Sequence, residues 1–135
     1  GTPEDIYKRP ASEFVARFIG GTNIFRGTKT NNDTVSCAGG LILRCGSGEF
    51  SADGKTAVSV RHHDIEVRTE RPQFETNTIS GTVARQIYLG SHRDYLVEMS
   101  NGEKIRAVAP VGIDIPVGRE VWLYFDPENC RALAR

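Results

Sequence analysis

Short apolar runs that recur about every ten residues after Gly21 constrain the fold of this chain more than any other feature. Some alternate apolar and polar positions and others are continuously apolar, with turn residues between them, as in a β-sandwich or barrel. Asp53-Gly54 and Asn101-Gly102 predict hairpin turns, because both pairs accept positive φ angles. The expected strands are 23–28, 35–38, 41–45, 56–60, 65–68, 78–89, 94–99, 104–108 and 120–125.

The break at Arg71-Pro72 divides these runs into two β-rich halves of similar size. A length of 135 residues suits one domain, or two small barrels that share a core. Gly81 lies inside the long run 78–89, where a barrel strand can bend. We therefore expect a first half at 21–72 and a second half at 73–135. No repeat strong enough to align the two halves residue by residue is evident.

Residues 1–20 have a helical pattern instead. Thr2 suits a helix cap, and Pro3 suits the first helical position. A second short helix is expected after Pro10, and its apolar stripe consists of Phe14, Val15, Phe18 and Ile19. No partner helix is expected elsewhere in the chain, so this stripe should pack on something outside the sequence. The segment does not read as the start of a protein.

Composition argues against several classes of protein. Seventeen basic and seventeen acidic residues cancel, so no global field favours nucleic acid or anionic lipid. No apolar run approaches the roughly 20 residues that span a bilayer, and no signal peptide is recognised. Three cysteines at irregular spacing, Cys37, Cys45 and Cys130, predict reduced structural thiols of a cytosolic protein.

No motif predicts catalysis or a metal site. The run 53–56 ends in Gly-Lys-Thr like a phosphate-binding P-loop, but a strand is expected after it and Glu49 replaces the earlier glycine of that motif. The adjacent His62 and His63 are expected at a strand end, where their rings point to opposite faces and cannot easily share a metal. The run 91–94 holds the residue types of a hydrolase triad, too close together for its geometry. We expect no enzymatic activity, no cofactor and no metal in this chain.

The densest polar and aromatic cluster consists of Arg85, Gln86, Tyr88, Ser91, His92, Arg93 and Tyr95. Of these, the candidates for contact with a ligand or another subunit are Arg85, Tyr88, His92, Arg93 and Tyr95. The alternative is a solvated hairpin whose tyrosines pack on the barrel. The run 120–125 is apolar on both faces, so Trp122 and Tyr124 are candidates for contact with another subunit or domain.

Two parts of the chain resemble a known family. The run 1–10, Gly-Thr-Pro-Glu-Asp-Ile-Tyr-Lys-Arg-Pro, and the run 14–20, Phe-Val-Ala-Arg-Phe-Ile-Gly, closely resemble the segment that ends the nucleotide-binding domain of bacterial ABC-importer ATPases. In those ATPases a transport-associated OB domain follows the nucleotide-binding domain, and the second half of this chain is similar to it. The runs that carry this similarity are Gly81-Thr82-Val83, Tyr88-Leu89-Gly90, Tyr95-Leu96-Val97-Glu98, 117–123 and Phe125-Asp126-Pro127-Glu128. The run 18–27 resembles the polyamine, ferric-iron and thiamine branch of that family.

This resemblance implies OB-type small barrels, tandem or intertwined, after the helical end of an ATPase domain at 1–20. It also implies a non-catalytic regulatory and dimerisation domain of an importer's ATP-binding subunit, with sensing of a small ligand in some members. The family usually has Arg-Pro-Glu at the end of a strand in the first half. This chain keeps only the arginine, Arg61, and we take it as a further contact candidate.

The implied partners are the domain's own ATPase, a twin subunit and, through the whole protein, membrane permease subunits, at the cytoplasmic face of the inner membrane. ATP and Mg²⁺ would bind the ATPase domain only. The alternatives are a stand-alone OB-type nucleic-acid binder, disfavoured by the zero net charge, and a stand-alone small-ligand module.

Overall fold

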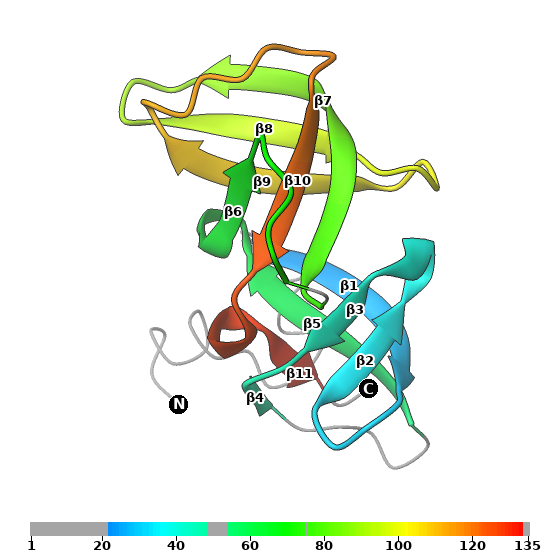
Figure 1. The fold of residues 1–135 in the computed structure, drawn as a ribbon. Coiled ribbons are helices and arrows are strands. Elements are labelled where there is room, and N and C mark those ends of the chain that lie inside the picture. Colours follow the sequence, from blue (N-terminus) through cyan, green and yellow to red (C-terminus); the bar gives the residue numbers. More distant parts are fainter. Residues whose placement is uncertain (1–21, 49–53, 75, 134–135) are drawn as a thin grey trace.

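Two curled sheets lie one above the other in the computed structural model, which describes residues 22–48, 54–74 and 76–133 (Figure 1). The six-stranded sheet has the order β3-β2-β1-β5-β11-β4, and the five-stranded sheet the order β6-β10-β7-β8-β9. The mainly β fold is therefore confirmed. The helical segment expected at 1–20 lies outside the described residues.

In this described part, the strands are joined by hairpins, loops and three single-turn 3-10 helices, η1 (Ala38–Gly40), η2 (His62–Asp64) and η3 (Pro127–Asn129). In chain order the strands are β1 (Thr22–Lys29), β2 (Thr34–Cys37), β3 (Ile42–Arg44), β4 (Ser47–Gly48), β5 (Lys55–Arg61), β6 (Ile65–Arg68), β7 (Thr78–Tyr88), β8 (His92–Glu98), β9 (Lys104–Pro110), β10 (Glu120–Phe125) and β11 (Arg131–Leu133).

Each predicted strand is present, with ends displaced by at most two residues. The hairpin turn at Asn101-Gly102 is confirmed: Gly102 has φ +86°, and its amide donates to the Met99 carbonyl over 3.0 Å. The short strands β4 and β11 were not predicted. The placement of His62 and His63 at a strand end was wrong, because they belong to the 3-10 turn η2.

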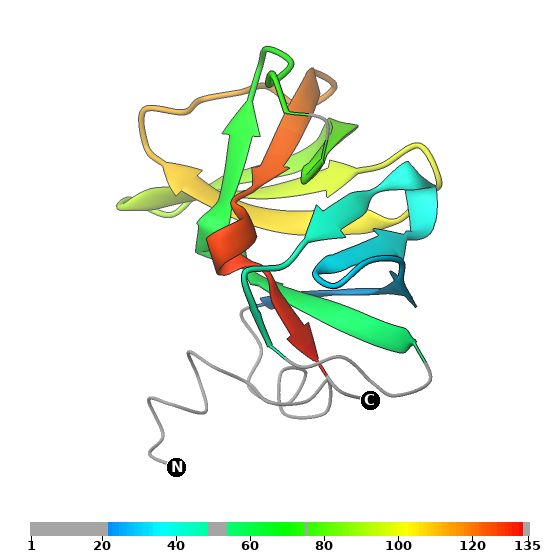
Figure 2. The same cartoon turned by 60° about the horizontal axis from the view of Figure 1, so that its bottom comes forward.

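The two halves of the chain exchange their last strands. After β5 the chain turns through η2, and β6 then pairs with β10 of the second half. After β10 it turns through η3, and β11 pairs with β5 of the first half. The red strand β11 accordingly lies beside the green strand β5 of the lower sheet (Figures 1 and 2).

The larger of two apolar clusters in the described residues forms the core and takes residues from both halves. Phe25 of β1 and Phe125 of β10 meet edge to face there, with ring centroids 5.4 Å apart. Such a pair adds about 0.5–1.5 kcal/mol beyond the apolar area it buries. The core therefore belongs to both halves.

The strands β1 and β7 carry the same motif, Asn-x-apolar-x-Gly-Thr, at 23–28 and 77–82. The two asparagines occupy equivalent places. Asn23 pairs with Val60, which lies two residues before η2, and the Asn77 carbonyl accepts a hydrogen bond from the amide of Phe125, which lies two residues before η3. The glycines also correspond. A Cβ on Gly27 would lie 2.3 Å from the Ser36 carbonyl oxygen, and one on Gly81 2.8 Å from that of Glu98. The two halves therefore share a short motif at equivalent places, which the sequence analysis did not identify.

The two asparagines of this motif bind backbone across the halves. Asn23 donates to the Arg106 carbonyl (2.7 Å) and accepts from the Arg106 amide (3.2 Å), on the edge strand β9. Asn77 donates to the Arg44 carbonyl (3.0 Å) and accepts from the Arg44 amide (2.9 Å), on the edge strand β3. Each side-chain amide replaces a peptide group that a neighbouring strand would supply.

Candidate groove at the edge of the second sheet

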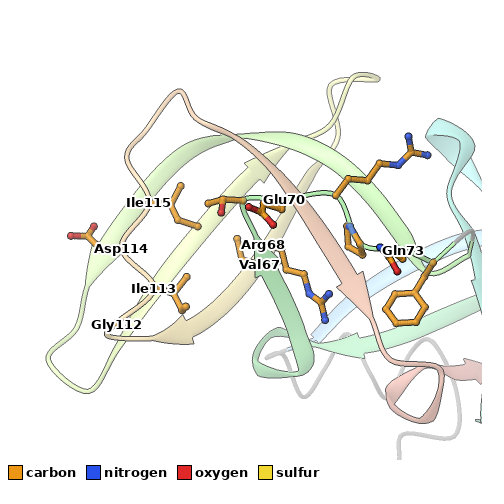
Figure 3. Close-up of a pocket in the computed structure, with 12 residues that line it drawn as sticks. Val67, Arg68, Glu70, Gln73, Gly112, Ile113, Asp114 and Ile115 are labelled. Atoms are coloured by element: carbon orange, nitrogen blue, oxygen red, sulfur yellow. The ribbon is translucent and has the colours of Figure 1, made fainter.

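A groove of about 760 Å³ opens where the edge strands β6 and β9 end (Figure 3). That volume lies in the range of small-molecule sites. One wall is the segment 68–74 that leads out of β6, and the other is the loop 112–115 that follows β9. Val67 and Ile115 are buried at its base, while Ile113 is partly exposed.

Tyr95 of β8 holds the loop wall in place. Its side chain is fully buried, and its hydroxyl donates to the Ile113 carbonyl and accepts from the Ile115 amide at 2.9 Å. Gln86 of β7 donates to the same hydroxyl (3.2 Å) and to the Asp114 carboxylate (3.1 Å). Because the polar groups of this loop are bonded to two strands, the loop is a rigid wall.

Arg93 of β8 fixes the start of the same loop. Its Nε donates to the Val111 carbonyl (2.7 Å), and its Nη1 donates to the side-chain oxygen of Gln86 (2.9 Å). The guanidinium also lies 5.0 Å from the centre of the Tyr88 ring and 3.6 Å from the Asp114 carboxylate. The structure thus brings three candidates, Tyr88, Arg93 and Tyr95, into one network with Gln86.

The opposite wall presents polar and aromatic side chains to solvent. Phe74 is about half exposed and stacks on Tyr124 of β10, with ring centroids 4.6 Å apart. Arg68 lies over the same Tyr124 ring at 5.3 Å and pairs with Glu66 at 3.1 Å. Trp122 and Tyr124 are partly exposed on the outer face of β10, while Val121, Leu123 and Phe125 are buried.

The remaining candidates lie away from the groove. Arg61 ends β5 beside η2. Arg85 follows a bulge in β7, and its charge helps to lower the pKa of Asp94. His92 begins β8, where its Nδ1 lies 2.8 Å from the hydroxyl of Ser91.

A second polar cluster lies on the neighbouring strands β8 and β9, where β9 contacts η2. Asp94 of β8 is almost buried, and both of its carboxylate oxygens accept from the Arg106 guanidinium, at 3.1 and 3.0 Å from Nε. This hydrogen bonding lowers the pKa of Asp94 despite its burial. The pKa of His62 is also lowered, first by burial and then by the charge of Arg106.

The described residues bear on the chemistry that the sequence left open, which is metal binding, thiol reactivity and phosphate binding. No group of three or more His, Cys, Asp or Glu side chains there could hold a metal ion. Burial raises the pKa of Cys37 to about 11 and that of Cys45 to about 12, and Cys130 shifts the same way. All three are therefore protonated, unreactive thiols at neutral pH. Lys55 and Thr56 lie in β5, so the P-loop-like run lacks the helix that a phosphate site needs.

We expect Tyr95→Phe to lower the free energy of unfolding by about 1–2 kcal/mol, because the Ile115 amide and Ile113 carbonyl lose their partner. Amide hydrogen exchange at 111–115 should accelerate while exchange in β1 and β5 stays unchanged. Unchanged exchange in this loop would show that the hydroxyl does not hold it. Tyr88→Phe is the matched control, since its hydroxyl has no hydrogen bond to another described residue and its ring stays under Arg93.

Comparison with known proteins places the chain in a family. The family described as TOBE domain matches residues 58–133. The spermidine/putrescine import ATP-binding protein PotA of Trichormus variabilis is 35% identical over 142 residues, which cover 98% of this chain and 37% of that protein. The Fe(3+) ions import ATP-binding protein FbpC of Fusobacterium nucleatum is 31% identical over 126 residues, which cover 91% of this chain and 33% of that protein.

A solved structure has the same fold. The cytoplasmic molybdate-binding protein ModG aligns with a TM-score of 0.66 over 84% of this chain and 96% of its own, at 13% sequence identity. In the described part of the chain, no helix is long and apolar enough to cross a membrane. The chain, which spans about a third of the length of these import proteins, belongs to the TOBE domain family and is homologous to the C-terminal region of PotA and FbpC ATP-binding subunits.

Proposed function

We propose that this chain is a non-catalytic regulatory and dimerisation domain of an ABC importer's ATP-binding subunit. The observation that carries the proposal is that nearly the whole chain aligns with importer ATP-binding proteins but spans only about a third of their length. The remaining part would be an ATPase domain that binds ATP and Mg²⁺. The complete protein would contact membrane permease subunits, and these contacts would hold it at the cytoplasmic face of the inner membrane.

The proposed contact with a twin subunit is the outer face of β10. Trp122 and Tyr124 lie there beside Phe74, which is half exposed, so the face offers aromatic surface to a partner. A lasting contact of this kind keeps two ATPase domains close when their nucleotide sites open, so that closing again is an intramolecular step. This contact requires no catalytic residue in the domain.

The groove is the proposed site of any regulatory ligand. Its loop wall is rigid, and the facing wall offers Glu70, Arg71 and Gln73, for which no hydrogen bond or ion pair to another described residue is seen. Polyamine, ferric-ion or thiamine-like cargo would suit the branch that the sequence resembles. A ligand there would bias an open or closed transporter only if it bound the two states unequally.

Thermal unfolding of the domain against spermidine, putrescine, thiamine, ferric ion, molybdate, sulfate and phosphate tests the ligand part. A bound compound at a hundredfold its dissociation constant adds about 2.7 kcal/mol, which raises Tm by several degrees. We expect a shift with one cargo class, and its loss in Glu70→Ala or Arg71→Ala. Arg44→Ala, on the far sheet, is the control that should keep the shift.

The absence of any shift would reject ligand sensing and leave a passive dimerisation domain. That part is tested in the complete ATP-binding subunit, where Trp122→Ala and Tyr124→Ala together should weaken self-association without nucleotide. Unchanged self-association would reject the β10 face as the contact with the twin subunit.

A further inference from the structure

We propose that Asn101 is a site of spontaneous deamidation, and that the β8–β9 hairpin, closed against η1, sets the rate of this reaction. Asparagine is a chemically labile residue. It is most reactive before glycine, because a side chain on the next residue would crowd the backbone nitrogen that attacks. Asn101 is followed by Gly102, whereas the other five asparagines of the chain precede Ile, Asn, Asp, Thr or Cys. The sequence therefore singles out one position.

The reaction uses only the chain and water. The backbone nitrogen of Gly102 loses its proton and attacks Cγ of Asn101, so that an N–Cγ bond forms, the Cγ–Nδ2 bond breaks and ammonia leaves. Water then opens the cyclic imide. Cleavage of the N–Cγ bond gives aspartate. Cleavage of the bond between this nitrogen and the backbone carbonyl carbon of Asn101 gives isoaspartate, whose main chain runs through Cβ and Cγ. Both products carry a new negative charge.

The fold leaves this pair open to solvent. Asn101 and Gly102 are both exposed, at the turn between β8 and β9. A Cβ built on Gly102 would meet no atom within 4 Å. Water therefore has access to the imide once it forms, and solvent exposure does not limit the reaction.

Hydrogen bonds occupy both reacting groups while the turn is closed. The Gly102 amide donates to the Met99 carbonyl over 3.0 Å, so the nitrogen that must attack keeps its proton and is directed across the turn. Oδ1 of Asn101 accepts from the Glu103 amide over 3.0 Å, which holds the side chain toward Glu103. The Met99 amide donates to the Glu103 carbonyl over 2.8 Å and closes the turn. The turn must open locally before the nitrogen can reach Cγ.

The side-chain amide of Asn101 is also packed against the first half of the chain. A Cβ built on Gly39 of η1 would lie 3.0 Å from Nδ2 of Asn101, the nitrogen that leaves as ammonia. The neighbouring Gly40 has a similar φ, +79° against +75°, but a Cβ there would meet no atom within 4 Å. Opening the turn therefore includes lifting the hairpin tip from η1, and the rate of deamidation reports how often this happens.

The two products change the hairpin tip differently. Aspartate keeps the main chain of the turn and adds a carboxylate two residues before that of Glu103. Isoaspartate adds an atom to the main chain of the turn, so the bonds of Met99 to Gly102 and Glu103 cannot all keep their geometry. We expect isoaspartate to hold the turn open, which makes a transient opening permanent. The inference concerns this hairpin alone, so it stands or falls independently of the proposed function.

The test follows deamidation by mass spectrometry at mildly alkaline pH, in the folded chain and in the chain unfolded by guanidinium chloride. Trypsin cuts after Arg93 and Lys104 and releases 94–104, in which Asn101 is the only asparagine. Conversion of the amide to a carboxylate raises the mass of this peptide, and chromatography separates its aspartate and isoaspartate forms. In the unfolded chain we expect Asn101 to react before the other asparagines. In the folded chain it should react at least about tenfold more slowly, because two hydrogen bonds must break first.

Two alanine variants of η1 separate the contact with Asn101 from backbone strain. Gly39→Ala places a methyl group against Nδ2 of Asn101, and the folded variant should deamidate about fivefold faster than the wild type, as the loss of one ordinary hydrogen bond would give. Gly40→Ala is the matched control. It imposes a similar positive φ on alanine but leaves Asn101 untouched, so it should react at the wild-type rate.

Another asparagine that reacts before Asn101 in the unfolded chain would overturn the assignment of the site. Equal rates in the folded and unfolded wild type would overturn the control by the hairpin. Equal rates in folded Gly39→Ala and Gly40→Ala would overturn the role of η1. If Gly39→Ala does not fold, the comparison of folded and unfolded wild type decides the proposal alone.

Discussion

Asn77→Ala should destabilise this domain by about 3–5 kcal/mol, the largest effect of any single substitution considered. Its buried side chain bonds the amide and carbonyl of Arg44, and its Nδ2 lies 3.5 Å from the Cys130 sulfur. Its φ is +60°, which alanine adopts only at a cost. The substitution therefore leaves two backbone groups without a partner and adds backbone strain. Guanidinium denaturation measures the change.

Asn77→Gly separates the two causes. Glycine tolerates the positive φ, so this variant should recover about 1 kcal/mol of the loss while the amide contacts stay absent. Asn101→Ala is the control, because its exposed side chain accepts one bond, from the Glu103 amide, and should cost less than about 1 kcal/mol. Equal stabilities of Asn77→Ala and wild type would show that these contacts do not hold the halves together.

Arg106→Ala should cost about 2–3 kcal/mol at neutral pH, because it leaves the carboxylate of Asp94 almost buried without its cation. A fully buried pair would cost more, but half of the Arg106 side chain is exposed to water. Urea or guanidinium denaturation between pH 3 and pH 7, on wild type and variant together, gives the loss at each pH.

The loss should depend on pH in a defined direction. In the wild type the lowered pKa of Asp94 gives stability that is fully present above about pH 4 and is lost as pH falls through that lowered pKa. Without Arg106, burial raises the pKa, so the penalty acts at neutral pH and disappears as the folded variant takes up a proton. The difference in stability should therefore shrink toward pH 3.

Arg44→Ala is the matched control for this pair, since its 3.1 Å bond to Asp33 joins two exposed side chains. Its cost should stay below about 1 kcal/mol and vary little with pH. A loss in Arg106→Ala that is the same at pH 3 and pH 7 would show that its cause is packing of the arginine stem, not the charge of Asp94.

Local patterns along the chain predicted its strands well. Alternation such as that of 104–107, where Ile105 and Ala107 are buried, is visible in sequence because side chains alternate between the faces of a strand. The hairpin at Asn101-Gly102 was likewise predictable, since its turn needs a residue that accepts positive φ. By contrast, β11 is too short to have a period, and its pairing with β5 depends on residues far away in the chain.

The repeat could have been found from Asn23 and Asn77, which precede the same Gly-Thr pair. It was missed because only three of its six positions are identical, and because both asparagines appear in sequence as ordinary polar residues. Their importance comes from the edge strands that they bind, β9 and β3, and those contacts exist only after the halves have packed.

For the groove, the sequence placed Arg93 and Tyr95 in a polar and aromatic cluster but could not show that they hold the loop 112–115. The facing wall at 68–74 was expected only as a boundary between halves.

Sequence alone thus determined the β class, most strand positions and the family resemblance, because these depend on neighbouring residues. Only the tertiary structure decided the strand exchange, the two asparagine contacts and the groove. Each of these depends on segments that are distant in the chain and meet only when hydrophobic burial closes one core around both halves.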